Sequence, residues 1–125
     1  MDSTELKDLK IHAAHVRKMA LEAVHSAGAG HPGGSLSVAD ILTYLYFKEM
    51  NVNPKDAKNP ERDRFVLSKG HCSPALYGIL AEAGFIPKED IKGFRNINSY
   101  LQGHPDMKNV NGVDMSTGSL GQGIS

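Results

Sequence analysis

The chain has 125 residues, enough for one domain with a buried core. Lys plus Arg and Asp plus Glu number 14 each, so the formal charge is zero, and no basic stripe or acidic run favours nucleic acid or a strongly charged partner. The single cysteine, Cys72, excludes an internal disulfide and is interpreted as a buried thiol rather than a nucleophile. No apolar run could span a bilayer, and no secretory signal pattern is present. The composition therefore predicts a soluble, cytoplasmic protein that binds neither nucleic acid nor membrane.

A helix is predicted over Leu6–Ala27. Asp2 and Glu5 have the spacing of a capping box, in which each side chain accepts the backbone N–H of the other residue. Apolar residues then recur every three or four positions, which is typical of one buried helix face. Gly28 tolerates the left-handed conformation that often ends a helix, so it predicts the C-terminus of this element.

A glycine- and proline-rich loop is predicted over Gly30–Gly34, because these residues do not favour regular structure. Ser37 and Asp40 have the spacing of a second capping box. The apolar residues that follow predict a helix over Val38–Glu49. Residues 51–63 carry many charges and two prolines, which indicates a surface loop.

Residues 64–68, Arg-Phe-Val-Leu-Ser, are short, apolar and bounded by turn residues, so they predict one clear buried strand. A helix is predicted from Ser73-Pro74, with serine as the N-cap and proline as the first helical residue, to Gly84. A short helix over Pro87–Phe94 and a long loop over Asn96–Met115 follow. Because one strand cannot form a sheet, this order predicts the helix-rich opening part of an α/β domain.

The C-terminal segment carries the strongest functional signal. Gly118, Gly121 and Gly123 lack a Cβ atom, which lets the backbone approach a ligand closely. Ser119 and Gln122 have capping-box spacing, which predicts the start of a helix. A glycine-rich turn at a helix N-terminus presents free N–H groups and a positive dipole end. The segment is therefore predicted to bind a phosphate or diphosphate.

The six histidines fall into two groups. His12 and His15 lie three residues apart on the first predicted helix, which is compatible with a metal pair, but no further ligand lies nearby in the sequence. Surface or interhelical histidines are the favoured interpretation. His31, His71 and His104 each follow a glycine in a predicted loop, where a side chain is easily aimed into a cleft. An imidazole there can bind phosphate or move a proton, and solvated turn histidines are the equally favoured alternative.

Four blocks of the sequence resemble the N-terminal end of transketolases, and they occur in the order and at the spacing typical of that family. The similarity covers nearly the whole chain and is closest to the small N-terminal subunit of split transketolases, in which two polypeptides share the enzyme. The four blocks are residues 30–37, 64–77, 103–106 and 112–123.

The resemblance implies an α/β thiamine-diphosphate-binding fold, of which residues 1–125 form the N-terminal part, ending before the family's metal motif. It implies the transfer of a two-carbon ketol unit between sugar phosphates in carbohydrate metabolism, the pentose phosphate pathway included. The implied cofactors are thiamine diphosphate and Mg²⁺ or Ca²⁺. The Gly-Asp-Gly motif that holds the cation in the family is not found here, so no metal ligands are expected in this chain. The implied partners are a homodimeric assembly and a C-terminal transketolase subunit, and the chain alone is expected to be inactive.

The resemblance also assigns roles to individual residues. It implies that His31 contacts the substrate and supports proton movements, that His71 lies against the cofactor diphosphate and the reacting centre, and that His104 binds or polarises the substrate. The residues implied to line the cofactor are His71, Gly118, Ser119 and Leu120.

Three alternatives stay open at the level of sequence. The first is a non-catalytic remnant that binds a partner or persists as a helical domain, with an apolar face exposed where a sheet should pack. The second is a small phosphate-binding module built on the terminal glycine loop. The third is a related thiamine-diphosphate enzyme, such as a deoxyxylulose-phosphate synthase or a dihydroxyacetone synthase.

Overall fold

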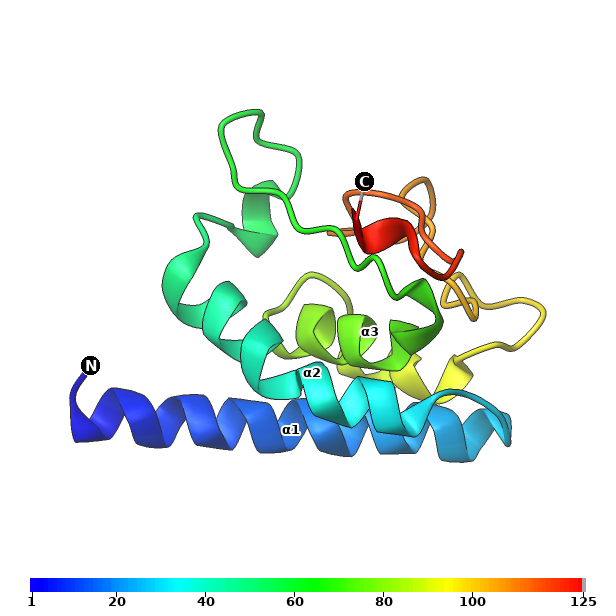
Figure 1. The fold of residues 1–125 in the computed structure, drawn as a ribbon, viewed down its shortest axis with the longest axis horizontal. Helices are drawn as coiled ribbons and strands as arrows, with labels where there is room; N and C mark the ends of the chain where they lie inside the picture. Colours follow the sequence, from blue (N-terminus) through cyan, green and yellow to red (C-terminus); the bar gives the residue numbers. More distant parts are fainter. Residues whose placement is uncertain (125) are drawn as a thin grey trace.

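Three mutually packed α-helices form the core of the protein. The computed structural model describes residues 1–124, apart from the side chain of Gln122. Figure 1 shows α1 running along the whole length of the molecule, with α2 and α3 against it and most of the irregular segments on the side of α3 away from α1. The helices are α1 (Ser3–Ala27), α2 (Pro32–Tyr44) and α3 (Ser73–Glu82). The π-helical turn Leu45–Glu49 extends α2, and 3-10 turns occupy Pro54–Asp56, Gly70–Cys72, Lys88–Gly93 and Gln122–Ile124.

The predicted capping box at the start of α1 is confirmed. The backbone N–H of Glu5 donates to Asp2 Oδ1 at 2.8 Å, and that of Asp2 donates to Glu5 Oε2 at 3.0 Å. Because Asp2 is the N-cap, the helix begins at Ser3 rather than at Leu6. Gly28 ends it in the left-handed conformation, with φ of 65°.

The predicted start of α2 is wrong. The helix begins at Pro32, with His31 as its N-cap, because the fixed φ of proline suits the first helical position. The glycines after Pro32 are therefore helical rather than part of a loop. A Cβ atom on Gly34 would lie 2.3 Å from the sulfur of Cys72, so this glycine allows α2 to touch the turn Gly70–Cys72. The hydroxyl of Ser37 donates to the carbonyl of Gly34 inside the helix and caps nothing.

The predicted strand at residues 64–68 is also wrong, and residues 1–124 contain no strand at all. The segment has no regular secondary structure, because a strand requires a ladder partner and the neighbouring chain is irregular. The backbone N–H of Phe65 donates instead to Asp114 Oδ2 at 2.7 Å. The same carboxylate forms a largely covered ion pair with Arg62, in which the Asp114 side chain is 3 % and the Arg62 side chain 10 % exposed. An ion pair and a hydrogen bond, rather than a sheet, thus hold this segment beside residues 112–118.

Helix α3 lies at the centre of the molecule, and its residues from Ser73 to Ala81 are buried. Ser73 is the first helical residue rather than the predicted N-cap, and its hydroxyl donates to the carbonyl of Gly103 at 2.7 Å. The hydroxyl of Tyr77 donates to the carbonyl of Gln102 at 2.6 Å. Burial raises the pKa of Tyr77, which keeps the phenol protonated as a donor. These two hydroxyls fix the loop that carries His104.

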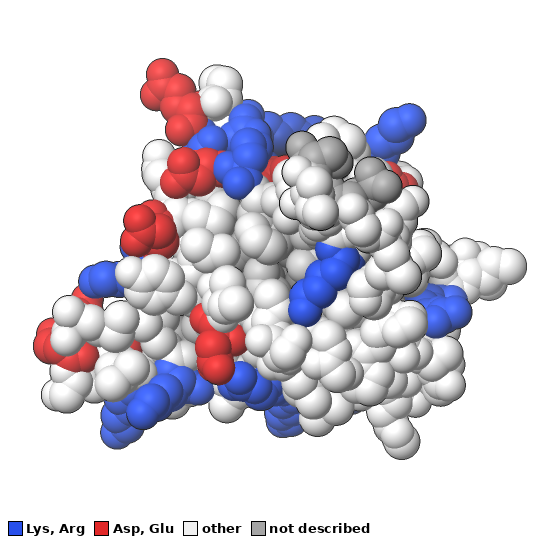
Figure 2. Space-filling view, viewed as in Figure 1, with Lys and Arg blue, Asp and Glu red and all other residues white. Residues whose placement is uncertain are grey.

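The surface carries dispersed charges. Figure 2 shows acidic and basic side chains interspersed over the face drawn, separated by uncharged areas. This distribution agrees with the zero formal charge of the sequence. Among residues 1–124, no helix combines the length and the apolar character needed to cross a bilayer.

Candidate functional site

The three loop histidines meet at one cavity. The N-cap of α2 is His31, and the turn Gly70–Cys72 carries His71. The third histidine, His104, lies in the loop that the hydroxyl of Tyr77 on α3 holds by a hydrogen bond. The cavity has a volume of about 580 Å³. Its other lining residues are Gly30, Phe94, Arg95, Gln102 and Gly103. Residues that are far apart in the sequence thus place three imidazoles around one space.

His71 has a polar atom with no partner. Its Nδ1 atom is buried and makes no hydrogen bond with any described part of the protein. The ring of His31 meets that of His71 edge to face, with centroids 5.1 Å apart and an interplanar angle of 86°. A buried polar atom without a partner costs free energy, so a ligand that bonded to Nδ1 would relieve that cost.

Arg95 is a residue of the cavity that the sequence analysis did not single out. It is the one non-glycine residue with positive φ, 65°, in the part of the chain that the structure describes. Its backbone N–H donates to the carbonyl of Leu101 at 2.8 Å, which holds the turn. The guanidinium adds a permanent positive charge to the histidine cavity. No local pattern pointed to it, since a basic residue in a polar loop is typical of a solvated surface.

A second cavity, of about 960 Å³, lies along the terminal glycine loop. Two of the residues predicted to line the cofactor, Gly118 and Ser119, line it. Leu120 does not, and its side chain is 74 % exposed. The remaining lining residues are Val66, Ser68, Met115, Ser116, Thr117 and Gly123.

Gly118 brings the terminal loop against the histidines. A Cβ atom at this position would lie 3.2 Å from Cγ of His104. A Cβ atom on Gly70 would lie 2.6 Å from the backbone nitrogen of Gly118 and from Thr117 Oγ1. The Thr117 hydroxyl is itself buried without a hydrogen-bond partner among the described residues. The two cavities are therefore neighbours, separated by closely packed glycine backbone.

The predicted helix start near Ser119 is a single 3-10 turn, Gln122–Ile124, in the described chain. The Ser119–Gln122 capping box depends on the side chain of Gln122, which lies outside the described part, as does Ser125. Within residues 1–124, the loop backbone and the neighbouring side chains are the groups that could bind an anion here.

Cys72 and Asp114 are not available for chemistry at this site. Cys72 is fully buried, and burial raises the pKa of its thiol, which opposes thiolate formation. The carboxylate of Asp114 is engaged by Arg62 and Phe65.

Among residues 1–124, one group of three side chains could hold a metal ion: His12, His15 and Glu82. This group shares no residue with either cavity.

Comparison with known proteins places the chain in a family. Residues 9–125 match the family model described as "Transketolase, thiamine diphosphate binding domain". The chain is 48% identical over 118 residues to the 6-deoxy-6-sulfo-D-fructose transketolase subunit SqwG of Clostridium sp. (strain MSTE9), covering 94% of this chain and 43% of that protein. It is 44% identical over 121 residues to one subunit of the apulose-4-phosphate transketolase of Phocaeicola vulgatus, covering 97% of this chain and 43% of that protein.

Solved structures agree with these matches. The transketolase from Leishmania mexicana superposes with a TM-score of 0.87 at 37% identity, covering 93% of this chain and 18% of that one. The chain spans less than half the length of the two relatives described above. The chain belongs to the transketolase thiamine-diphosphate-binding domain family.

Proposed function

We propose that this chain supplies part of the cofactor and substrate site of a transketolase-type enzyme. The reaction is the transfer of a two-carbon ketol unit between sugar phosphates, in carbohydrate metabolism such as the pentose phosphate pathway and in the cytoplasm. The observation that carries the proposal is the convergence of His31, His71 and His104 on one cavity beside Gly118. Family membership and the relatives named as transketolase subunits support the same assignment.

Two features around the terminal loop fit thiamine diphosphate. The backbone of Gly118 and Gly123 lines the cavity along the loop, where Thr117 offers a buried hydroxyl without a partner in the described chain. The neighbouring histidine cavity holds His71, whose buried Nδ1 also has no partner there. When bound, the cofactor supplies the carbanion chemistry of ketol transfer. We propose that Gly118, Ser119 and His71 contact it. Leu120 is exposed, so its proposed contact depends on further polypeptide covering this surface.

The histidine cavity has the groups that a sugar-phosphate substrate requires. Imidazoles such as those of His31 and His104 can exchange protons with sugar hydroxyl and carbonyl oxygens. Arg95 provides a positive charge for an anionic end group. The names of the two relatives, which specify a sulfofructose and apulose-4-phosphate, describe substrates with one sulfonate or phosphate group. We propose that Arg95 binds such a group here.

The resemblance to transketolases implies that Mg²⁺ or Ca²⁺ accompanies the diphosphate. The ligands of this cation must come from outside residues 1–124. No group of metal-binding side chains lies beside the glycine loop within residues 1–124. We infer that the rest of this domain supplies these ligands, that a C-terminal transketolase subunit in a homodimeric assembly completes the active site, and that the chain is inactive alone. Exposed apolar side chains on and beside the terminal loop fit a contact with such a partner: Val66, Met115, Leu120 and Ile124.

The test uses the complete enzyme, with this chain and its complementary polypeptide. Replacing His104 by alanine removes an imidazole from the cavity and is expected to lower kcat/KM for ketol transfer by about 10²–10⁴-fold. The matched control is His25→Ala, an exposed histidine of α1 outside the cavity, which is expected to leave kcat/KM unchanged. Equal activity of both variants would remove His104 from the proposed site.

A partner-binding role without catalysis is the second candidate, and the exposed apolar side chains of the terminal loop favour it. In that case the chain would associate with its partner, but the assembly would show no ketol transfer and no affinity for thiamine diphosphate. The activity of the unsubstituted assembly therefore separates the two functions.

A further inference from the structure

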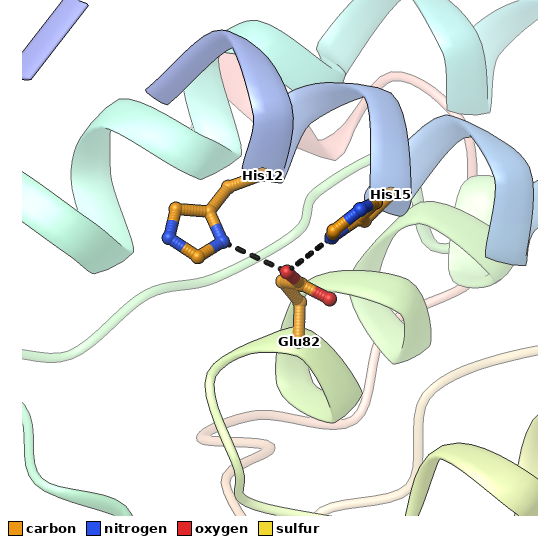
Figure 3. Close-up of side chains that lie close together, drawn as sticks. All are labelled: His12, His15 and Glu82. Carbon is orange, nitrogen blue, oxygen red and sulfur yellow. Dashed lines mark hydrogen bonds and ion pairs between the residues drawn. The ribbon is translucent and has the colours of Figure 1, made fainter. Parts of the chain in front are cut away.

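Two histidines of α1 and one glutamate of α3 meet away from the two cavities. Figure 3 shows His12 and His15, one turn apart on α1, pointing toward Glu82, the last residue of α3. The Nδ1 atoms of His12 and His15 each lie 2.8 Å from the same oxygen, Oε1 of Glu82. The three ligand atoms all lie within 4.8 Å of one another. We refer to these residues as the His12–His15–Glu82 cluster.

The surrounding structure fixes the cluster in place. The Glu82 side chain is only 4 % exposed, so its carboxylate cannot swing into solvent without unpacking the end of α3. The ring of His12 stacks on Phe47, with centroids 4.0 Å apart and planes 7° from parallel. The ring of His15 stands at 83° to that of His12, so the two imidazoles approach the carboxylate from different directions. Such preorganisation lowers the cost of binding an ion.

The hydrogen bonds of the cluster join both rings to one carboxylate oxygen of Glu82. An ionised carboxylate only accepts hydrogen bonds, so each Nδ1 carries a hydrogen when no metal is bound. A cation bound at Nδ1 would take the place of these hydrogen bonds, and each neutral ring would then carry its one hydrogen on Nε2 instead.

We propose that the His12–His15–Glu82 cluster binds a divalent transition-metal ion of the zinc class. Two imidazole nitrogens and one carboxylate oxygen form a ligand set that Zn²⁺ and Co²⁺ accept, with the fourth position left open. Zinc bonds of about 2.0–2.2 Å require tetrahedral ligand atoms about 3.3–3.5 Å apart. The donors would therefore separate by about half an ångström from their present 2.8 Å, which small side-chain rotations supply.

Solvent reaches the cluster on one side. A cavity of about 240 Å³ lies beside His15 and Glu82 and is also lined by Lys18, Met19, Glu22 and Lys88. It offers an entry path and room for a water in the fourth position. The ammonium of Lys88 lies 3.3 Å from Glu82 Oε2, so it competes with the metal ion for this carboxylate.

The third member of the cluster is 67 residues from His15, so the sequence does not display it beside the histidine pair. The fold brings Glu82 to both rings. The interhelical interpretation accounts for the two hydrogen bonds, but it predicts no affinity for metal. The inference does not depend on the proposed ketol transfer, because the cluster shares no residue with the two cavities.

The experiment is a calorimetric titration of the full chain with Zn²⁺, repeated with Co²⁺ while its visible absorption is recorded. One equivalent is expected to bind, with the spectrum of tetrahedral cobalt. His12→Asn and His15→Asn place an amide nitrogen near the position of Nδ1, so they keep a donor for Glu82 but remove a metal ligand. Each is expected to weaken the affinity by at least about tenfold, since even the loss of an outer-shell partner costs about 10–100-fold. The matched controls, His25→Asn on the same helix and His71→Asn in the histidine cavity, are expected to leave it unchanged.

Lys88→Ala provides a test in the opposite direction, because it removes the competing ammonium and is expected to tighten Zn²⁺ binding. Absence of saturable binding, or equal affinity in His15→Asn and the unsubstituted chain, would overturn the proposal. His15 is half-exposed, so His15→Asn decides the question even if His12→Asn does not fold.

Discussion

Replacing Asp114 by alanine is expected to destabilise the chain by about 3–5 kcal/mol, because it leaves the Arg62 guanidinium buried without its counter-ion. Both side chains are almost fully covered, and the carboxylate also accepts the backbone N–H of Phe65. The loss should appear as a lower free energy of unfolding in urea denaturation of the purified chain. It should also release residues 64–68 from the terminal loop.

A second ion pair provides the matched control. Arg17 on α1 and Asp40 on α2 form two hydrogen bonds, of 3.0 and 2.7 Å, but Asp40 is largely exposed. Asp40→Ala is therefore expected to cost less than about 1 kcal/mol, since solvent screens the exposed pair. Equal losses for Asp40→Ala and Asp114→Ala would show that burial of the Arg62 pair is not what stabilises this segment.

The second large effect is expected from Gly70→Ala. The new Cβ atom would lie 2.6 Å from the carbonyl carbon of Thr117 and the backbone nitrogen of Gly118, and backbone atoms cannot rotate away as a side-chain tip can. The terminal glycine loop must therefore move away from His71 and His104. A displacement of about 1 Å at a reacting site can cost about 100-fold in rate. The kcat/KM of the complete enzyme is expected to fall by about that factor.

Gly33→Ala is the control for that substitution. Gly33 lies in α2, and nothing lies within 4 Å of the Cβ atom it would gain. Because alanine is a better helix former than glycine, this variant is expected to gain about 0.5–1 kcal/mol in stability without losing activity. If Gly70→Ala were as active as Gly33→Ala, the close packing of the glycine loop would have no part in catalysis.

Local features of the fold were predictable from the sequence. The capping box of Asp2 and Glu5 and the left-handed cap at Gly28 depend on neighbours within a few residues, which the sequence displays directly. The start of α2 was missed because the glycines after Pro32 have low helix propensity. Tertiary packing overrides that propensity, since Gly34 lies against Cys72. The strand at 64–68 was predicted wrongly for a different reason: its apolar pattern is real, but a ladder needs a partner strand.

The candidate site was predicted unevenly. The motifs identified His31, His71 and His104 as a set, and the structure brings them to one cavity. Arg95 was not predicted as a site residue, because its position in the cavity depends on a turn with positive φ that no local sequence pattern indicates. Glu82 was not linked to the histidine pair, because its partners come from a helix that precedes it by nearly 70 residues. Long-range contacts of this kind follow from the packing of helices and not from spacing along the chain.

The measurement that tests the central claim most directly is calorimetric titration with thiamine diphosphate and Mg²⁺, with inorganic diphosphate as the control ligand. We expect the chain alone to bind thiamine diphosphate weakly, without dependence on Mg²⁺, and no better than diphosphate. Addition of the polypeptide that completes this domain, together with the C-terminal subunit, is expected to give tight, Mg²⁺-dependent binding that diphosphate does not reproduce. Tight, Mg²⁺-dependent binding by the chain alone would contradict the account, because the cation ligands would then lie within this chain.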